Sequence, residues 1–136
     1  MRTCVGTYAC LIAFASLGTA RGHDTAQELA QIAGEWVAES SVRTGQEPAK
    51  KAVLKGLTLE VSGNRWVQNY RGELAPYVIS LDTSRNPKAM VLTHQKVNAQ
   101  RICTYELEGD RLTITEQIGQ AGDERVTVWR RKPPPG

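Results

Sequence analysis

Apolar residues recur at every second position through most of this chain, in short runs that turn sequences separate. Leu57, Leu59 and Val61 form one such run, and Leu112 and Ile114 form another. A period of two predicts strands whose alternate side chains enter a core. Tight turns between the runs leave no room for crossover helices, which favours antiparallel pairing. The predicted strands are residues 35–43, 56–61, 65–71, 76–82, 88–94, 101–108, 110–116 and 125–131.

A set of eight short antiparallel strands has two edges to protect, and closure into a barrel is the simplest way to do so. The sequence therefore predicts an all-β fold, an antiparallel up-and-down eight-stranded barrel, although periodicity alone does not distinguish a barrel from a sandwich. A short helix is expected over residues 25–33, ending at Gly34. The long connection 44–55 is expected to hold a helical turn over 49–54.

Residues 1–22 have the pattern of a secretory signal peptide. A positive start at Arg2 precedes an uncharged, largely apolar stretch over residues 4–18, and small residues follow it. The alternative, a transmembrane anchor, is disfavoured because the stretch is short and diluted by Gly, Thr and Ser. We therefore expect a signal peptide that is removed, a barrel domain over residues 23–132 with no membrane span, a proline-rich tail over 133–136 and a secreted or periplasmic location.

Residues that could carry chemistry are sparse in this chain. Removal of the predicted signal peptide leaves Cys103 as the only cysteine, and its place in the alternation predicts a buried thiol. His94 has no partner at a spacing typical of a metal or catalytic site, and nucleophile, zinc and phosphate-loop motifs are absent from the sequence. A formal net charge of +3 gives no electrostatic footprint for nucleic acid. We expect no enzyme, metal, cofactor or nucleic-acid partner.

An ordered set of short motifs resembles a known family. The motifs are Gly34-Glu35-Trp36, Lys55-Gly-Leu-Thr-Leu59, Gly63-Asn-Arg65, Leu81-Asp82, Pro87-Lys88-Ala-Met90 and Tyr105-Glu-Leu-Glu-Gly-Asp110-x-Leu112. Their order over residues 29–116 is similar to that of the lipocalin-like domain family of uncharacterised exported proteins found in planctomycete bacteria. The resemblance implies a G-x-W lipocalin-like barrel and export from the cytoplasm, and it implies no particular activity.

The resemblance also implies structural roles at one end of the barrel. Gly34 would let the helix pack closely on the first strand, and Trp36 would plug the barrel. An arginine of the last strand, Arg130 or its neighbour Arg131, would lie across the indole in a cation–π contact. The chain departs from the family at Ala75-Pro76-Tyr77, where Gly-x-Tyr is usual. The proline predicts a fourth strand that begins late or carries a bulge.

Aromatic and semi-polar side chains share one face of the middle strands, where they suit either a cavity wall or a packed core. The candidate ligand-binding residues are Trp66, Tyr70, Tyr77, Met90 and Tyr105. We expect a non-enzymatic exported protein that binds a small apolar or amphipathic ligand inside the barrel. One alternative is a filled barrel that acts as an envelope protein-interaction module with a protein partner. The other is a small hydrolase or isomerase, which needs polar residues clustered inside the barrel.

Overall fold

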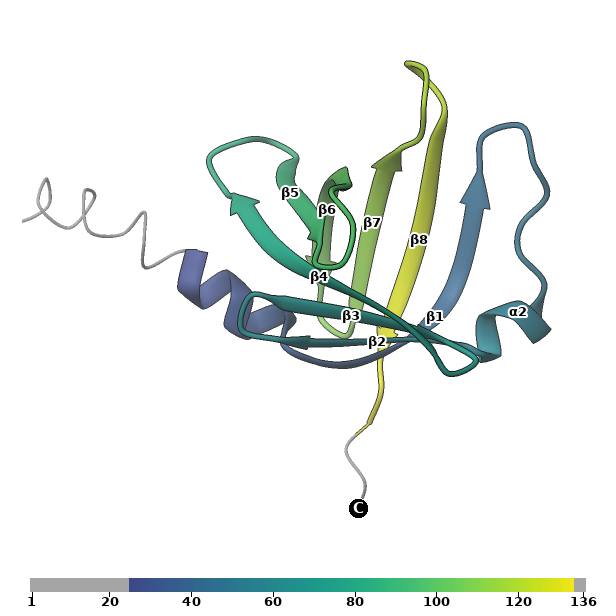
Figure 1. Ribbon diagram of the computed structural model, residues 1–136, viewed down its shortest axis with the longest axis horizontal. Helices are drawn as coiled ribbons and strands as arrows, with labels where there is room; N and C mark the ends of the chain where they lie inside the picture. The colour runs from purple at the N-terminus through teal and green to yellow at the C-terminus, as the bar shows by residue number, and fades with distance from the viewer. Residues whose placement is uncertain (1–24, 134–136) are drawn as a thin grey trace, which may run out of the picture.

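Eight antiparallel strands close into a single barrel in which each strand pairs with its neighbours in sequence order (Figure 1). The computed structural model describes residues 25–133. Pairing of the last strand with the first completes the ring, so the predicted up-and-down barrel is confirmed and a sandwich is excluded. The strands are β1 Gly34–Arg43, β2 Leu57–Ser62, β3 Arg65–Tyr70, β4 Glu73–Asp82, β5 Lys88–His94, β6 Gln100–Glu108, β7 Arg111–Gln117 and β8 Glu124–Arg131.

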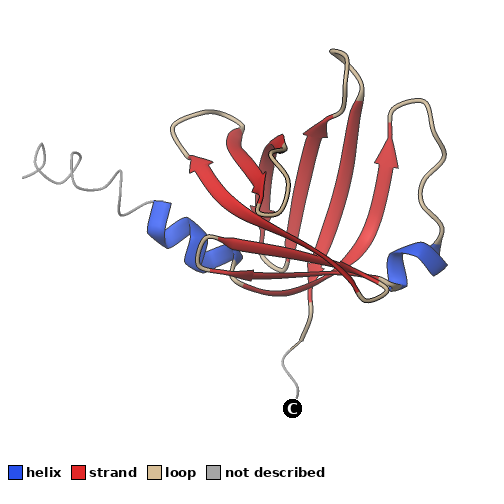
Figure 2. Ribbon diagram, viewed as in Figure 1, coloured by secondary structure: helices blue, strands red, loops and turns tan. Residues whose placement is uncertain are grey.

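Two short helices flank the barrel (Figure 2). The first covers residues 25–32 and leads directly into β1, and the second, α2 Lys51–Lys55, lies in the connection between β1 and β2. Both match the helical segments predicted from the sequence. The first helix places Ile32 in the interior with no exposed surface, and α2 buries Leu54 against the barrel. Each helix is thus held by an apolar anchor, because segments this short are not stable helices alone.

The fourth strand begins earlier than the sequence predicted. It starts three residues before Pro76 and pairs with β3 without a register shift, so the predicted late start or bulge is wrong. Gln95 donates its backbone amide to the Pro76 carbonyl at 3.0 Å, which shows that the polar backbone atoms of Pro76 face β5. The β4–β5 ladder begins only at the next pair, Tyr77 with His94. Pro76 therefore interrupts no ladder hydrogen bond although it lies within the strand.

Alternate residues of the strands point into the barrel and pack one half of it solidly. The side chains with the least exposure come from nearly every strand, so the core is the barrel interior itself. Members of this packed half are Trp36, Leu59, Val61, Met90, Leu92, Cys103, Tyr105 and Leu112. Burial of such residues, at roughly 25 cal/mol per Å² of apolar surface, is the main term that stabilises the fold.

The predicted signal peptide of residues 1–22 and most of the predicted proline-rich tail lie outside the described residues. Within residues 25–133, neither helix has the length and apolar character that crossing a membrane requires.

Candidate functional site

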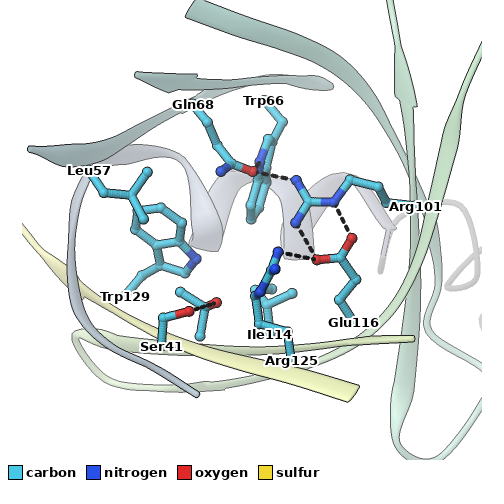
Figure 3. Close-up of a pocket in the computed structure, with 10 residues that line it drawn as sticks. Ser41, Leu57, Trp66, Gln68, Arg101, Ile114, Glu116, Arg125 and Trp129 are labelled. Atoms are coloured by element: carbon cyan, nitrogen blue, oxygen red, sulfur yellow. Dashed lines mark hydrogen bonds and ion pairs between the residues drawn. The ribbon is translucent and has the colours of Figure 1, made fainter. Parts of the chain in front are cut away.

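A pocket of about 260 Å³ lies in the other half of the barrel, where the core residues Trp66, Ile114 and Trp129 form part of its lining (Figure 3). Its lining combines apolar and charged side chains from six strands, with β2 contributing only its first residue. The lining residues are Ser41, Leu57, Trp66, Gln68, Arg101, Ile114, Glu116, Arg125, Thr127 and Trp129. Arg125 keeps 41% of its side-chain surface exposed, so the pocket is reachable from solvent. This volume lies just below the roughly 300–1,000 Å³ of pockets that take drug-sized ligands.

The charged residues reach the pocket because they lie in phase with the apolar inner face of their strands. Arg101 is two residues before the buried Cys103 on β6, and Glu116 is two residues after the buried Ile114 on β7. Cys103 pairs directly with Glu116 across the two strands, which brings the charges close together. Sequence reasoning missed Arg101, Glu116 and Arg125. The available signal was an ionisable residue at an inward position of an alternating strand.

Arg101 and Glu116 form a bidentate ion pair inside the pocket. Nε and Nη2 of Arg101 each donate to a Glu116 carboxylate oxygen at 2.6 Å, and Nη1 donates to the Gln68 side-chain oxygen at 2.7 Å. Among residues 25–133, Glu116 is the one buried charged residue, with 9% of its surface exposed. Burial lowers the pKa of Arg101, but hydrogen bonds and the charge of Glu116 outweigh burial and leave that pKa raised. Arg101 is therefore permanently charged, and each of its three nitrogens donates one hydrogen bond.

Two indoles contribute aromatic surface to the pocket. Trp66 and Trp129 meet edge to face, with ring centroids 6.5 Å apart and planes at 89°. The Trp66 Nε1–H donates to the Gln68 side-chain oxygen at 3.0 Å, which is the same oxygen that accepts from Arg101. Figure 3 shows Leu57 and Trp129 across the pocket from the Arg101–Glu116 pair. The pocket is therefore amphipathic, with Leu57 and Trp129 facing the charged pair and Trp66 beside it.

A bulge in β1 determines which of its serines enters the pocket. The register of β1 against β8 shifts between Ala38 and Ser40, so Ser41 rather than Ser40 takes the inward position beyond it. The Ser41 and Thr127 hydroxyls lie 3.2 Å apart, and either can donate to the other. Thr127 is two residues from Arg125 on β8, so both face inward. These groups add polar contacts beside the exposed arginine.

The opposite end of the barrel contains Trp36, which has no exposed surface and donates its Nε1–H to the Ile32 carbonyl at 3.0 Å. The guanidinium carbon of Arg131 lies 4.3 Å from the centroid of this indole. Arg131 also donates to the Ala33 carbonyl at 2.6 Å, which ties the end of β8 to the segment before β1. Cation–π contact and carbonyl hydrogen bonds together hold this end shut.

The structure specifies two details of this end that the prediction left open or gave differently. Arg131 rather than Arg130 covers the indole, because the inward position of Trp129 places Arg131 inward and Arg130 in solvent. Gly34 has a φ of +131°, and a Cβ there would lie 3.0 Å from Nη1 of Arg131. The glycine therefore makes room for the arginine as it rests on Trp36.

Only Trp66 among the five predicted ligand-binding residues lines the pocket. Tyr77 lies outside the lining, and its ring centroid is 5.4 Å from the guanidinium carbon of Arg101. Tyr70 is 38% exposed and lies outside the lining. Met90 is fully buried in the packed half of the barrel.

Tyr105, the fifth of these residues, connects the barrel to the N-terminal helix. It is 3% exposed, and its hydroxyl donates to a Glu28 carboxylate oxygen at 3.2 Å. Lys88 pairs with the same Glu28 oxygen at 2.7 Å. Burial raises the pKa of Tyr105 well above its usual value, and the charge of Glu28 adds to the shift. Tyr105 therefore holds the helix against the barrel and takes no part in the pocket.

The remaining residues that sequence reasoning considered have structural contacts. Cys103 is 1% exposed, as predicted, and burial raises the pKa of its thiol to about 11. His94 accepts the Lys96 backbone amide on Nδ1 at 3.1 Å and packs edge to face on Tyr77. Within the described part of the chain, His, Cys, Asp and Glu side chains form no group of three or more that could hold a metal ion.

Comparisons with known proteins add nothing to this geometry. No family model, curated protein or solved structure matches the chain. The resemblance to the lipocalin-like domain family therefore stays a prediction, and the pocket has to be interpreted from its own residues.

Proposed function

We propose that the protein is exported, to a secreted or periplasmic location, and that it binds one small amphipathic molecule in the pocket inside its barrel. The observation that carries this proposal is the pocket of about 260 Å³, in which two indoles and a charged pair line the same cavity. Such a combination of an apolar surface with a few placed polar groups is typical of small-molecule sites. The predicted signal peptide supports an extracytoplasmic location.

The size of the pocket limits the ligand to one or two rings or an equivalent aliphatic group. Long-chain fatty acids and sterols are larger than 260 Å³ allows. A ligand of about 12 non-hydrogen atoms, at roughly 0.5 kcal/mol each, would bind with about −6 kcal/mol. That free energy corresponds to a dissociation constant of tens of micromolar.

The polar groups of the pocket support binding rather than catalysis. The carboxylate of Glu116 accepts two hydrogen bonds from Arg101 and has a second guanidinium, that of Arg125, 3.8 Å away. Both oxygens of this carboxylate already accept a hydrogen bond from Arg101, so Glu116 is held in the ion pair and is not directed at a bound ligand. Ser41 interacts with Thr127 rather than with a base that could activate it.

Tryptophan fluorescence tests the proposal, since Trp66 and Trp129 both line the pocket. Indoles, benzoates, phenylalkanoates and short fatty acids would be titrated, with a sterol as an oversized compound. We expect saturable changes for at least one small compound and none for the sterol. Thr127→Phe, which fills the pocket, should weaken binding at least tenfold. Thr113→Phe on the outer face of β7 is the matched control and should bind like the wild type.

A flat response across the panel, repeated by calorimetry, would overturn the proposal. Stable co-purification with an envelope protein together with that flat response would favour the interaction-module alternative instead. Turnover of a bound compound that Glu116→Gln abolishes would favour the enzyme alternative.

A further inference from the structure

We infer that the ligand carries a carboxylate, or an equivalent small anionic group, and that Arg125 is the residue that receives it. This inference rests on the proposed function and specifies the chemical class of the ligand. Its starting point is the charge balance of the pocket. Two guanidinium groups, Arg101 and Arg125, face one carboxylate, Glu116, which leaves one positive charge in excess.

The charges at the adjacent rim do not cancel this excess. Arg43 and Asp123 lie next to the pocket mouth and form their own pair, with Arg43 Nη2 2.9 Å from an Asp123 oxygen. The pKa of Asp123 is lowered mainly by its hydrogen bond to Arg43, and the charge of Arg125 makes a smaller contribution. Adding one cation and one anion leaves the charge balance of the pocket lining unchanged.

Hydrogen bonding identifies which arginine is available to a ligand. Three of the five N–H groups of Arg101 already donate, two of them to Glu116 and one to Gln68. Arg125 makes a longer contact, with Nη1 3.8 Å from Glu116, and keeps 41% of its side chain exposed. A distance of 3.8 Å is an ion pair but too long for a hydrogen bond. Arg125 therefore retains donors arranged in the fork that suits a carboxylate.

Neighbouring hydroxyls and indoles complete the site for such a ligand. In the Ser41–Thr127 pair one hydroxyl hydrogen is used between the two oxygens, so the other remains free to donate. Thr127 lies two positions from Arg125 on the same inward face. An aromatic or branched apolar group would rest against Trp66 and Trp129. The best fit is a monocarboxylate whose apolar part contains one or two rings.

Three probes of nearly equal shape test the inference, because they differ mainly in charge. These probes are indole-3-acetate, indole-3-acetamide and tryptamine, titrated by calorimetry at pH 7. We expect the acid to bind at least tenfold more tightly than the amide, and the amine to bind most weakly. Arg125→Gln should weaken binding of the acid at least tenfold, down to the affinity of the amide. Arg130 lies on the same strand but on the outer face, so the control variant Arg130→Gln should change the affinity less than twofold.

The outcomes separate this inference from the proposed function. Equal affinity for the acid and the amide in the wild-type protein would overturn the inference while leaving a small-molecule site in place. Unchanged binding of the acid by Arg125→Gln, with circular dichroism showing a folded protein, would also overturn it. Failure of all three probes and of the wider panel would overturn the proposed function itself.

Discussion

Glu116→Gln isolates the ion pair inside the pocket, because glutamine keeps the shape of the side chain and removes its charge. Arg101 would then face a neutral amide, and Arg125 would lose its nearest anion. The loss is expected to exceed that of an ordinary hydrogen bond, since an incompletely compensated charge stays within the barrel. The substitution therefore measures how strongly the charged side of the pocket depends on its single carboxylate.

The size of the effect follows from the exposure of the two partners. Removal of one member of a fully buried ion pair costs about 3–5 kcal/mol. The Arg101 side chain keeps 24% of its surface exposed and that of Glu116 keeps 12%, so water compensates part of the loss. Arg101 also retains its hydrogen bond to Gln68, and the glutamine carbonyl can still accept one bond. We expect about 2 kcal/mol of destabilisation, or about 8 °C in Tm for a domain of this size.

Urea denaturation at pH 7, followed by tryptophan fluorescence and circular dichroism, measures this quantity. The midpoint should fall by about 1 M with an unchanged slope of roughly 2 kcal/mol per M. Glu106→Gln is the matched control, since Glu106 is exposed on β6, and it should change stability by less than about 0.5 kcal/mol. The double variant Arg101→Met with Glu116→Leu should recover most of the loss, because apolar replacement of a whole pair is often neutral. Equal stabilities for Glu116→Gln and the control would refute the reasoning.

Two further predictions concern the packed half of the barrel. Arg131→Met removes the cation above Trp36 and the hydrogen bonds to backbone carbonyls, so the free energy of unfolding measured in urea should fall by about 2–3 kcal/mol. Arg130 is exposed, so Arg130→Met should lower it by less than about 0.5 kcal/mol. The reverse order would contradict the assignment of Arg131 to the indole. The Cys103 thiol has a folded pKa of about 11 against an ordinary value of 9.0, so at pH 9 about one folded molecule in a hundred carries a thiolate, compared with about half of unfolded molecules. Because the folded state holds this proton more tightly, the contribution of the Cys103 thiol to stability should fall as the pH rises from about 9 to 11. Iodoacetamide at pH 9 should label Cys103 at least fiftyfold more slowly in native protein than in urea-unfolded protein.

Much of the fold was predictable because strand geometry is local. Successive side chains of a strand point to opposite faces, so the alternation from Leu57 to Val61 predicts both the strand and its inner face. Pro76 misled the prediction, because its effect depends on whether a neighbouring strand needs its missing N–H. That information belongs to the pairing partner and is absent from the local sequence.

The candidate site was much less predictable, although part of the signal was present. The inward phase of Trp129 already assigns Arg131, not Arg130, to the indole side. The phase of Glu116 likewise places a carboxylate inside the barrel. Aromatic and semi-polar side chains of the middle strands were predicted instead, because an aromatic ring with a polar group suits a cavity wall. Alternation reports that a side chain points inward, but it does not report whether the surrounding space is filled.

The amino-acid sequence by itself determined the strand count, the turns and the division of side chains between interior and surface, because these depend on contacts between near neighbours in the chain. Tertiary structure alone decided that Arg101, Glu116 and Arg125 meet around one pocket. Their meeting depends on the register of each strand pair, on the bulge that turns Ser41 inward and on closure of β8 against β1. Closure of the ring depends on the registers of all strand pairs together, so it cannot be predicted from any single segment of the chain.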